Sequence, residues 1–525
     1  MKRRDFIKRV PIAALPVVLN GISMQSYAAS PLLAALANSA DTDHVLVVIQ
    51  IVGGNDGLNT VIPLDQYSNL SAARSNVMIA QNKVLALKGT TATGLHPSLT
   101  GLQQMYNDDK LRIVQSVSYP NPNFSHFRAT DIWMSGSDSN QVLNTGWTGR
   151  YLNYEYPNFP TGYPNTTVPD PLAIQMSSVL QLISQGPSTN MAMSIADPSN
   201  IYNLVNGLTD PAPATPAGKE LTYIREVARQ TNQYGAVIKA AWGTTPKQTG
   251  TSLRQQLMSV AQLIKGGLKT RVYIVTTSAD GSFDTHSAQV AAGATESGNH
   301  ADLLANLSSS IKDFQDALEA GGVADRVIGM TFSEFGRRIK SNASLGTDHG
   351  AAAPMFVFGT KVIPGILGTN PQIPATVSVN DNLPMQYDFR SIYASLLQDW
   401  LCVPKADIDS TILLQNFQAL PLVDASGCNS TAIHEINSKA GLNLISCYPN
   451  PFVSSTNITF TTGGGHTLIQ IFDGEGHLIR KLIDETMQAG DYKVSFENEN
   501  YASGVYYARF QNGVVQQVCT MVIAK

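Results

Sequence analysis

The chain has 525 residues, of which 14% are charged and 43% hydrophobic, and its formal net charge is −4. This length exceeds the roughly 250–300 residues at which a single core stops growing, so we expect more than one domain. The charge balance offers no basic surface of the kind that binds nucleic acid. The composition is therefore that of a folded globular protein with a large core and no nucleic-acid partner.

The N-terminal segment has the layout of an export signal. Residues 1–29 begin with basic side chains, continue with a short apolar stretch and end in small residues, which predicts cleavage near Ala28 or Ala29. Arg3 and Arg4, followed by Asp-Phe-Ile-Lys, resemble the twin-arginine export motif, an address that a receptor reads. The alternative, a membrane anchor, is disfavoured because the apolar stretch falls short of the about 20 residues that a span requires. We expect no transmembrane anchor later in the chain.

Four segments each read as a buried strand followed by a polar loop. They cover residues 44–59, 110–136, 271–289 and 327–337. Continuous apolar runs of this kind are typical of strands buried on both faces, as in a parallel sheet. Residues 303–320 carry helical periodicity between the third and fourth strands. The order predicts an α/β fold, a mostly parallel sheet flanked by helices, with functional residues at the carboxyl ends of the strands.

Changes of composition divide the chain further. Residues 40–420 read as the α/β domain, and within it residues 151–215 are rich in Pro, Asn and Tyr, which predicts an insertion that covers the site. Residues 421–444 are small and polar, as in a linker. Residues 445–525 contain short alternating runs between Gly and Asn turns, which predicts a small C-terminal β-sandwich.

The four cysteines all lie in the last quarter of the chain. None has zinc-finger spacing, and an exported protein permits disulfides. The domain order favours the pairs Cys402–Cys428 and Cys447–Cys519, and free thiols are the alternative.

The C-terminal sandwich also carries three short motifs: YPNPF at 448–452, GVYYARF at 504–510 and a terminal VCTMVIAK. Together they resemble the C-terminal sorting domain of type-nine secretion, type A variety. The resemblance implies passage through the periplasm to the outer-membrane surface or the exterior, with the export machinery as a partner at both ends of the chain. The alternative is an immunoglobulin-like appendage that binds carbohydrate or protein.

Side chains of the kinds that bind metals follow each of the four strands. Carboxylates and imidazoles in this mixture suit zinc or a similar divalent ion. Burying so many acids without partners would cost several kcal/mol each, so convergence requires either metal or salt bridges. In chain order these side chains are Asn55, Asp56, Ser125, His126, Asp284, His286, Glu334, Asp348 and His349.

Several motifs over residues 40–420 carry a resemblance to a known family. They include GGNDGLNTVIPL (53–64), NFSHFRATDIWMSG (123–136), SFDTHSAQ (282–289), SEFGR (333–337) and GTDHGAAAPMFVFG (346–359). On these motifs the chain resembles the exported proteins of the domain of unknown function 1501 family, which are similar to the alkaline phosphatase and sulfatase superfamily.

The resemblance implies two divalent metal ions. One would be held by Asp56, Ser125 and Glu334, and the other by Asp284, His286 and His349. Asn55, His126 and Asp348 are supporting candidates, with Asp348 orienting His349 rather than touching metal. Glu334 stands where the superfamily usually has Asp, and Asp284 and His286 are closer in sequence than the usual Asp-x-x-x-His.

The same resemblance implies that Ser125 is the nucleophile and that Arg128, one helical turn further, holds a substrate oxygen. Each position also has a structural alternative. Asp56 is a common turn former, Ser125 is a favoured helix N-cap, and His126 could be a packed loop histidine. Glu334 could pair with a following arginine.

Two functions follow from these patterns. The first is a secreted, metal-dependent hydrolase of phosphate or sulfate esters, acting on a small molecule or a polysaccharide. The alternative is a non-catalytic cell-surface or matrix binding protein that keeps the fold.

Overall fold

The computed structural model describes residues 43–198, 215–244, 249–428 and 445–524, the last range without 463–464, 475, 489, 500 and 513–514, together with strands β1 (Val17–Leu19) and β2 (Ile22–Met24). Apart from these two strands, the predicted export signal lies outside the described residues, as does most of the predicted linker. The chain divides into two compact units, one of residues 42–428 and one that contains the C-terminal strands. The domain boundaries read from the sequence stay predictions.

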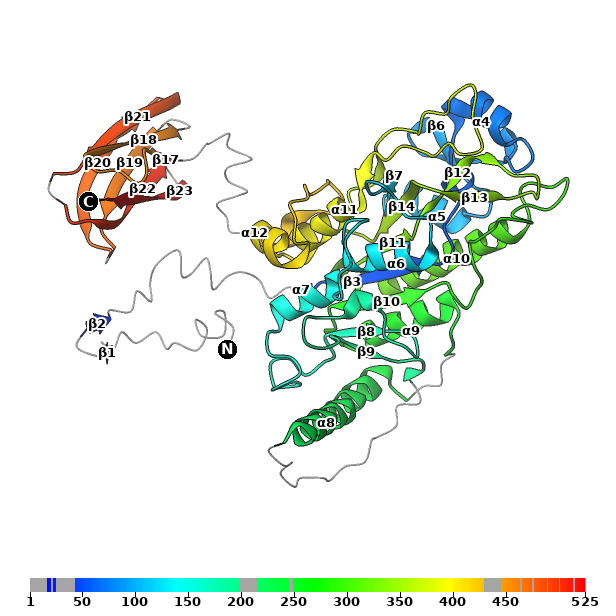
Figure 1. Cartoon of the computed structure of the whole chain (residues 1–525), viewed down its shortest axis with the longest axis horizontal. Coiled ribbons are helices and arrows are strands. Elements are labelled where there is room, and N and C mark those ends of the chain that lie inside the picture. The colour runs from blue at the N-terminus through cyan, green and yellow to red at the C-terminus, as the bar shows by residue number, and fades with distance from the viewer. Residues whose placement is uncertain are drawn as a thin grey trace. The chain divides into compact units, whose positions relative to one another are not determined.

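The larger unit is built on a nine-stranded sheet with the strand order β15-β7-β14-β11-β3-β10-β8-β9, with β16 also paired to β7 (Figure 1). Strand β14 is antiparallel to its two neighbours, and the other pairings are parallel. This confirms the predicted α/β class. The strands are β3 (Val45–Ile51), β7 (Leu111–Ser118), β8 (Ala173–Gln175), β9 (Ala192–Ser194), β10 (Val272–Thr276), β11 (Val327–Ser333), β14 (Ala353–Phe358), β15 (Gly365–Leu367) and β16 (Tyr387–Asp388).

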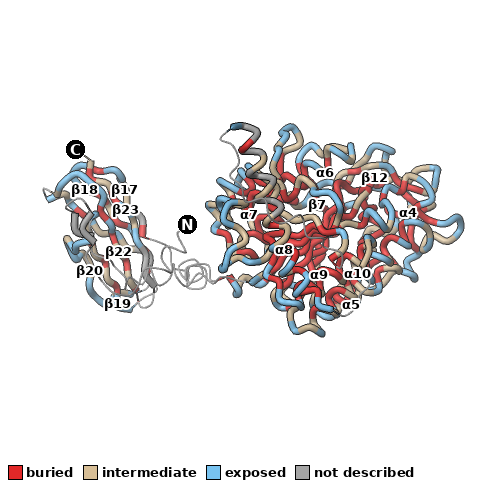
Figure 2. The backbone as a smooth tube through the Cα atoms, turned by 90° about the horizontal axis from the view of Figure 1, so that it is seen from below, coloured by how far each residue is buried: buried red, intermediate tan, exposed pale blue. Residues whose placement is uncertain are grey.

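The central strand β3 packs on both faces of the sheet. Its odd-numbered residues Val45 and Val47 lie in one hydrophobic core, and its even-numbered residues Leu46 and Val48 lie in the other. Because successive side chains of a strand point to opposite faces, a nearly unbroken apolar run is what this position requires. Figure 2 shows buried residues concentrated through the interior of this unit.

Helices cover both faces of the sheet. The first core includes residues of α5 (Thr100–Asn107), α8 (Pro216–Trp242), α9 (Leu253–Lys265) and α10 (Asn299–Ala320). The second core includes residues of α6 (His126–Ser135), α7 (Trp147–Glu155) and α11 (Phe389–Ser395). Capping residues fix the start of α9, where Ser252 and Gln255 form a capping box.

Two short parts of the segment predicted as an insertion pair with the main sheet. Within residues 151–215, strands β8 and β9 pair in parallel with each other and extend the sheet beyond β10. Each strand has three residues, which is too short to show a period in the sequence. Residues 199–214 lie outside the described part. That this segment covers the site stays a prediction.

Smaller elements follow β3 and β11. A three-stranded sheet consists of β4 (Val61–Pro63), β5 (Leu85–Leu87) and β6 (Thr90–Leu95), and short helices α3 (Gly57–Thr60) and α4 (Tyr67–Arg74) lie beside it in sequence. The hairpin of β12 (Gly336–Ser341) and β13 (Thr347–Gly350) comes directly after β11. Helix α12 (Lys405–Asp407) lies near the end of the unit.

The C-terminal unit is all-β and antiparallel, as predicted. One sheet has the order β17-β18-β21 and the other β20-β19-β22-β23, and both contribute side chains to one core. The strands are β17 (Ser446–Tyr448), β18 (Ser455–Thr462), β19 (Gly465–Phe472), β20 (Leu478–Met487), β21 (Gly490–Glu497), β22 (Gly504–Asn512) and β23 (Val515–Ile523).

The structure joins Cys402 to Cys428 and Cys447 to Cys519, the two pairs favoured by the domain order. Among the described residues, no helix has both the length and the apolarity to cross a membrane.

Candidate metal centre

Neighbouring strands of the main sheet bring the candidate residues together. Strand β3 pairs in parallel with β10 on one side and with β11 on the other. Because the strands are parallel, the loops after all three leave the same edge of the sheet. The β12–β13 hairpin then returns the chain to this edge.

Three imidazoles surround the carboxylate of Asp284. Nε2 of His286 and Nε2 of His349 each lie 3.1 Å from Asp284 Oδ1, and Nε2 of His126 lies 3.4 Å from Asp284 Oδ2. The Nε2 atoms of His286 and His349 are 2.9 Å apart. His126, Asp284 and His349 offer ligand atoms that all lie within 4.8 Å of one another. Side chains from the loop after β10, from strand β13 and from the start of α6 therefore converge.

Each of these imidazoles is held by an oxygen at its other ring nitrogen. Nδ1 of His126 lies 2.8 Å from Glu334 Oε1, Nδ1 of His286 lies 3.0 Å from Asp348 Oδ1, and Nδ1 of His349 donates to the Phe124 carbonyl oxygen at 2.9 Å. An oxygen at Nδ1 fixes the tautomer and leaves Nε2 free to bind, which is how metal-binding histidines are usually supported. All three Nε2 atoms are left on the Asp284 side.

The spacing fits a single small cation. Zinc binds imidazole nitrogen and carboxylate oxygen at about 2.0–2.1 Å, so neighbouring ligands around a tetrahedral ion lie roughly 3.3 Å apart. The separations that join Asp284 to each imidazole, and His286 to His349, are 2.9–3.4 Å and are of that size. The three residues whose ligand atoms all lie within 4.8 Å of one another are His126, Asp284 and His349. Two unprotonated imidazole nitrogens 2.9 Å apart repel, so His286 and His349 require a shared proton or a shared cation. The donor set suits zinc or another divalent transition metal.

The charges around the cluster shift three of the pKa values. Burial alone would raise the pKa of Asp284, but the hydrogen bond from Arg337, together with the contact with His349, outweighs it and holds the pKa at about 2. The hydrogen bond to Glu334 raises the pKa of His126, and burial lowers the pKa of His349. Asp284 is therefore a carboxylate and His349 favours the neutral form, which are the forms that bind metal.

Arg337 ties together the segments that carry the cluster. Its side chain is fully buried, and it donates to the backbone carbonyl oxygens of Gly54 at 2.7 Å, Thr347 at 2.9 Å and Phe283 at 3.0 Å. It also donates to Asp284 Oδ1 at 2.7 Å. One guanidinium group thus fixes the loop after β3, the loop after β10 and strand β13 relative to one another. The sequence pattern pointed to this arginine only as a partner for Glu334.

Asp56 contacts Arg74 and Gln289, and its implied role as a metal ligand stays a prediction. Its carboxylate is fully buried and accepts hydrogen bonds from Arg74 at 2.8 and 2.9 Å and from Gln289 at 2.6 Å. Burial would raise its pKa, but Arg74 outweighs it and the pKa is lowered. Both oxygens have protein partners, so Asp56 forms a structural ion pair. Arg74 lies on α4, eighteen residues further on, and no motif pointed to it.

Glu334 and Asn55 also have partners other than metal. Glu334 is 1% exposed, and its Oε1 accepts from the Gly53 backbone N–H at 2.8 Å as well as facing His126. The Asn55 side-chain oxygen accepts from Thr60 at 3.0 Å and lies 3.0 Å from Nε2 of His300. Glu334 supports His126, and Asn55 belongs to a buried network; the number of ions stays a prediction.

Asp348, His126 and Arg128 differ in detail from their expected roles. Asp348 contacts His286 rather than His349. His126, a supporting candidate in the sequence, is part of the cluster itself. The Arg128 guanidinium donates to the backbone carbonyl oxygens of Asp138, Ser139 and Gln141, so it is engaged by the loop after α6 rather than by the site.

Ser125 occupies the N-cap position of α6, but its side chain caps no backbone N–H. The residue is exposed. Its neighbours on both sides contact the cluster, since the Phe124 carbonyl oxygen binds His349 and the His126 ring faces Asp284. The Ser125 hydroxyl is therefore close along the chain to the cluster and is not committed to a helix cap.

A surface depression of about 370 Å³ opens beside the cluster. Its lining includes His286, Asp348 and His349 together with Phe124, Arg338, Val379 and Asn380. Arg338 donates to the backbone carbonyl oxygens of His349 at 3.1 Å and Val379 at 2.9 Å, which holds its guanidinium at the pocket wall. No sequence motif assigned Arg338 to a pocket, and residues 379–380 carried no signal.

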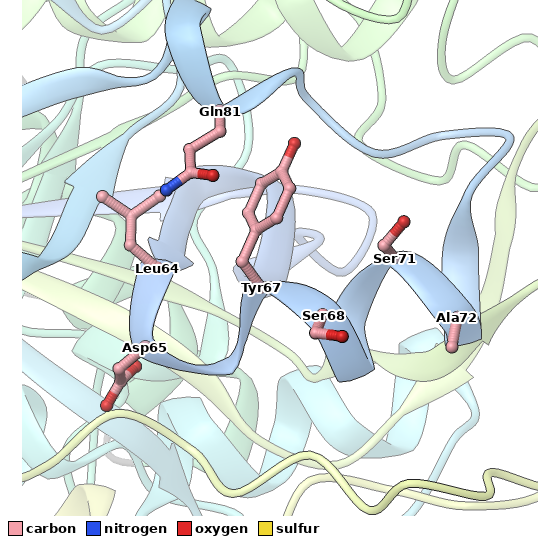
Figure 3. Close-up of a pocket in the computed structure, with 7 residues that line it drawn as sticks. All are labelled: Leu64, Asp65, Tyr67, Ser68, Ser71, Ala72 and Gln81. Carbon is pink, nitrogen blue, oxygen red and sulfur yellow. The ribbon is translucent and has the colours of Figure 1, made fainter.

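A larger depression of about 720 Å³ lies at the start of α4 (Figure 3). Its labelled side chains include Asp65, Tyr67, Ser68 and Gln81. Asp65 accepts a hydrogen bond from Asn370 and the Tyr67 hydroxyl donates to a backbone carbonyl oxygen. Its lining holds no histidine, so it does not match the metal chemistry of the first depression.

Two family models match the chain. Residues 220–401 match the model described as a protein of unknown function (DUF1501), and residues 446–524 match the model described as a secretion system C-terminal sorting domain. Both resemblances read from the sequence are confirmed over these residues. The sorting domain indicates export to the outer-membrane surface or the exterior, with the secretion machinery as a partner. The twin-arginine signal stays a prediction. No curated protein matches the chain in sequence.

Solved structures resemble the chain only loosely. PorZ, a surface component of the type-IX secretion system of Porphyromonas gingivalis, is 20% identical with a TM-score of 0.13, over 21% of this chain and 14% of PorZ. A protein in the alkaline phosphatase superfamily from Vibrio parahaemolyticus is 10% identical with a TM-score of 0.32, over 68% of this chain and 66% of that protein. The PsFucS1 sulfatase from Pseudoalteromonas sp. is 9% identical with a TM-score of 0.32, over 87% of this chain and 84% of the sulfatase. Superpositions this loose carry no argument about activity.

Proposed function

We propose that residues 42–428 form a metal-dependent hydrolase of phosphate or sulfate esters. The observation that carries the proposal is the convergence of three oxygen-supported imidazoles on Asp284, beside a depression that contains an arginine. We assign His126, Asp284, His286 and His349 as the residues that hold the ion. We propose one ion at this cluster, whereas the sequence resemblance implies two.

A divalent ion bound there would neutralise negative charge on a phosphate or sulfate ester and favour a deprotonated nucleophile. Neighbouring protein groups hold the imidazole and carboxylate ligands in the forms that bind a metal ion. Glu334, Asp348 and the Phe124 carbonyl oxygen hold the imidazoles in the binding tautomer. Arg337 keeps Asp284 ionised and in place.

Ser125 remains our candidate nucleophile. Its position at the N-terminus of the ten-residue helix α6 favours a negatively charged group, because unpaired backbone N–H groups point from a helix start. In the proposed reaction Ser125 Oγ gives up its proton and bonds to the phosphorus or sulfur atom, the bond from that atom to the ester oxygen breaks, and the ester oxygen takes up a proton and leaves as the alcohol. Water then breaks the serine ester and releases the inorganic anion.

Arg338 replaces Arg128 as the candidate for holding the substrate. It lines the depression and its backbone contacts fix its guanidinium beside His349. A guanidinium matches the geometry of phosphate and sulfate oxygens. Phe124 and Val379 add apolar wall to the same depression, which suits the organic part of an ester.

The test compares hydrolysis of p-nitrophenyl phosphate and p-nitrophenyl sulfate by zinc-loaded protein and its variants. We expect turnover by the wild type, loss of turnover in Ser125→Ala and in Asp284→Ala, and wild-type turnover in His466→Ala, whose exposed imidazole lies in the C-terminal unit. Equal inactivity of the wild type and all variants on both esters would reject the hydrolase.

A second function is favoured by one contact. Arg337 lies 2.7 Å from Asp284 Oδ1, so the cluster can balance its charge without an ion. A non-catalytic surface or matrix protein would need the cluster only as a cross-link between loops. In that case Asp284→Ala would lower stability while no ester is hydrolysed by any form of the protein.

A further inference from the structure

A second group of metal-binding side chains lies away from the first in sequence. His44 stands just before β3, Cys402 lies between α11 and α12, and Cys428 is the last residue of the larger unit. These three side chains each offer one ligand atom, and the ligand atoms lie within 4.8 Å of one another. The cysteines are joined as a disulfide, and the imidazole beside them takes no part in that bond.

The structure holds the His44 ring in one orientation. Its Nδ1 donates to the Trp400 carbonyl oxygen at 2.7 Å, and its ring stacks on the Trp400 indole at 3.9 Å between centroids with planes 5° apart. The indole is itself fixed, since its N–H donates to the Val45 carbonyl oxygen at 2.9 Å. Because Nδ1 carries the proton, Nε2 of the neutral ring has a free lone pair.

Nε2 also faces the segment that carries Cys428. A Cβ atom at Gly427 would lie 3.0 Å from His44 Nε2 and 2.7 Å from His44 Cε1, so the ring edge lies directly over this glycine. Cys428 is 3% exposed, whereas Cys402 and His44 are half-buried. The cluster is thus reachable from solvent on one side. The His44 ring is anchored as a metal-binding histidine is, with a backbone oxygen at the nitrogen that does not bind.

We propose that, when the Cys402–Cys428 disulfide is reduced, His44, Cys402 and Cys428 bind one thiophilic cation such as Zn²⁺. Two thiolates and one imidazole are a soft donor set that selects Zn²⁺ or Cu⁺ over Mg²⁺ and Ca²⁺. Around zinc the two sulfurs would stand roughly 3.8 Å apart, because Zn–S bonds are about 2.3 Å. The disulfide and the cation therefore exclude each other, and the oxidation state of one bond decides whether this site exists.

The chemistry balances with a phosphine as reductant. Tris(2-carboxyethyl)phosphine and one water reduce the disulfide to two thiols and become the phosphine oxide. Binding of Zn²⁺ then displaces the two thiol protons to solvent. The freshly synthesised chain reaches the same thiol form without a reductant.

The experiment measures zinc stoichiometry on the full-length protein that carries Cys447→Ser and Cys519→Ser, which removes the thiols of the C-terminal unit. Zn²⁺ is titrated calorimetrically into the oxidised protein and into the reduced protein. We expect one more equivalent of zinc in the reduced form. His44→Phe, which keeps an aromatic ring on Trp400 but offers no ligand, should weaken that extra equivalent by at least about 10-fold, the lower end of what a supporting partner of a ligand is worth.

A second readout follows the thiols directly. We expect Zn²⁺ to slow alkylation of Cys402 and Cys428 by iodoacetamide by about 10-fold or more, since the thiolate electrons are then shared with the ion. Near-ultraviolet circular dichroism reports whether the reduced protein keeps its packing. Equal zinc stoichiometry in both oxidation states, including the case in which reduction unfolds the protein, would overturn the proposal. So would an extra equivalent that His44→Phe binds as tightly as the parent.

Discussion

The change Asp56→Asn separates a structural ion pair from a metal ligand. Asp56 and Arg74 are fully buried, and the substitution removes the negative charge while leaving the guanidinium in place. Breaking a buried ion pair on one side costs about 3–5 kcal/mol. For a unit of about 390 residues, an unfolding entropy of about 2.1 cal/mol/K per residue gives roughly 0.8 kcal/mol/K. The thermal midpoint should therefore fall by about 4–6 °C.

The assay is differential scanning calorimetry of wild type and variant, with zinc content measured on the same samples. The matched control is Asp109→Asn, because the Lys88–Asp109 pair is about 60% exposed on both sides and such pairs are worth at most about 1 kcal/mol. We expect Asp56→Asn to keep its zinc. A midpoint within about 1 °C of wild type, combined with loss of zinc, would show that Asp56 is a metal ligand after all.

Acid should remove the stability that the Asp56–Arg74 ion pair contributes. The folded-state pKa of Asp56 lies below its ordinary value of 3.8, so the ion pair stabilises the fold fully above that value. The contribution is lost as the pH falls through the lowered folded-state pKa. The stability difference between wild type and Asp56→Asn should therefore shrink on acidification, and a constant difference down to pH 2 would contradict this expectation.

Three further changes test the metal centre itself. Arg337→Lys keeps a positive charge but loses most of the hydrogen bonds to backbone carbonyl oxygens. We expect zinc affinity to fall by about 10-fold, which is the effect of removing a residue that orients a metal ligand. Unchanged zinc affinity would show that Arg337 does not position the cluster. Glu334→Gln should lower the pKa of His126 in metal-free protein, as measured by NMR titration. The stability that the Glu334–His126 pair contributes is present below pH 6.5 and is lost as the pH rises through the raised pKa. A His126 pKa that is the same in the variant and the wild type would contradict the pairing. Gly346→Ala would place a Cβ atom 2.3 Å from the His286 backbone oxygen, so it should weaken zinc binding without removing a ligand. Wild-type affinity there would mean that the loop adjusts freely.

The main sheet could be read from the sequence because its central strands are buried on both faces. The runs within 44–59 and 327–337 are predominantly apolar, and that pattern is typical of the middle of a parallel sheet. Strands β8 and β9 could not be read in the same way, because three residues show no period. Their pairing with β10 depends on contacts distant in sequence.

Part of the candidate site could be predicted from metal-binding residue types that follow predicted strands. Asp284, His286 and His349 stand after predicted strands and do meet in space. Asp56 satisfies the same rule, but in the structure its carboxylate pairs with Arg74, which comes from a helix with no distinguishing motif. The sequence predicted His126 only as a supporting residue, because the position of a histidine at a helix start does not indicate where its ring points.

The most direct test of the central claim is the zinc content and affinity of the oxidised wild-type protein, measured by isothermal titration calorimetry and elemental analysis. We predict one tightly bound equivalent, lost in His349→Ala and kept in the control His466→Ala, whose imidazole is exposed. A wild-type protein that binds no divalent ion, or a His349→Ala variant that binds it as tightly as wild type, would contradict the claim.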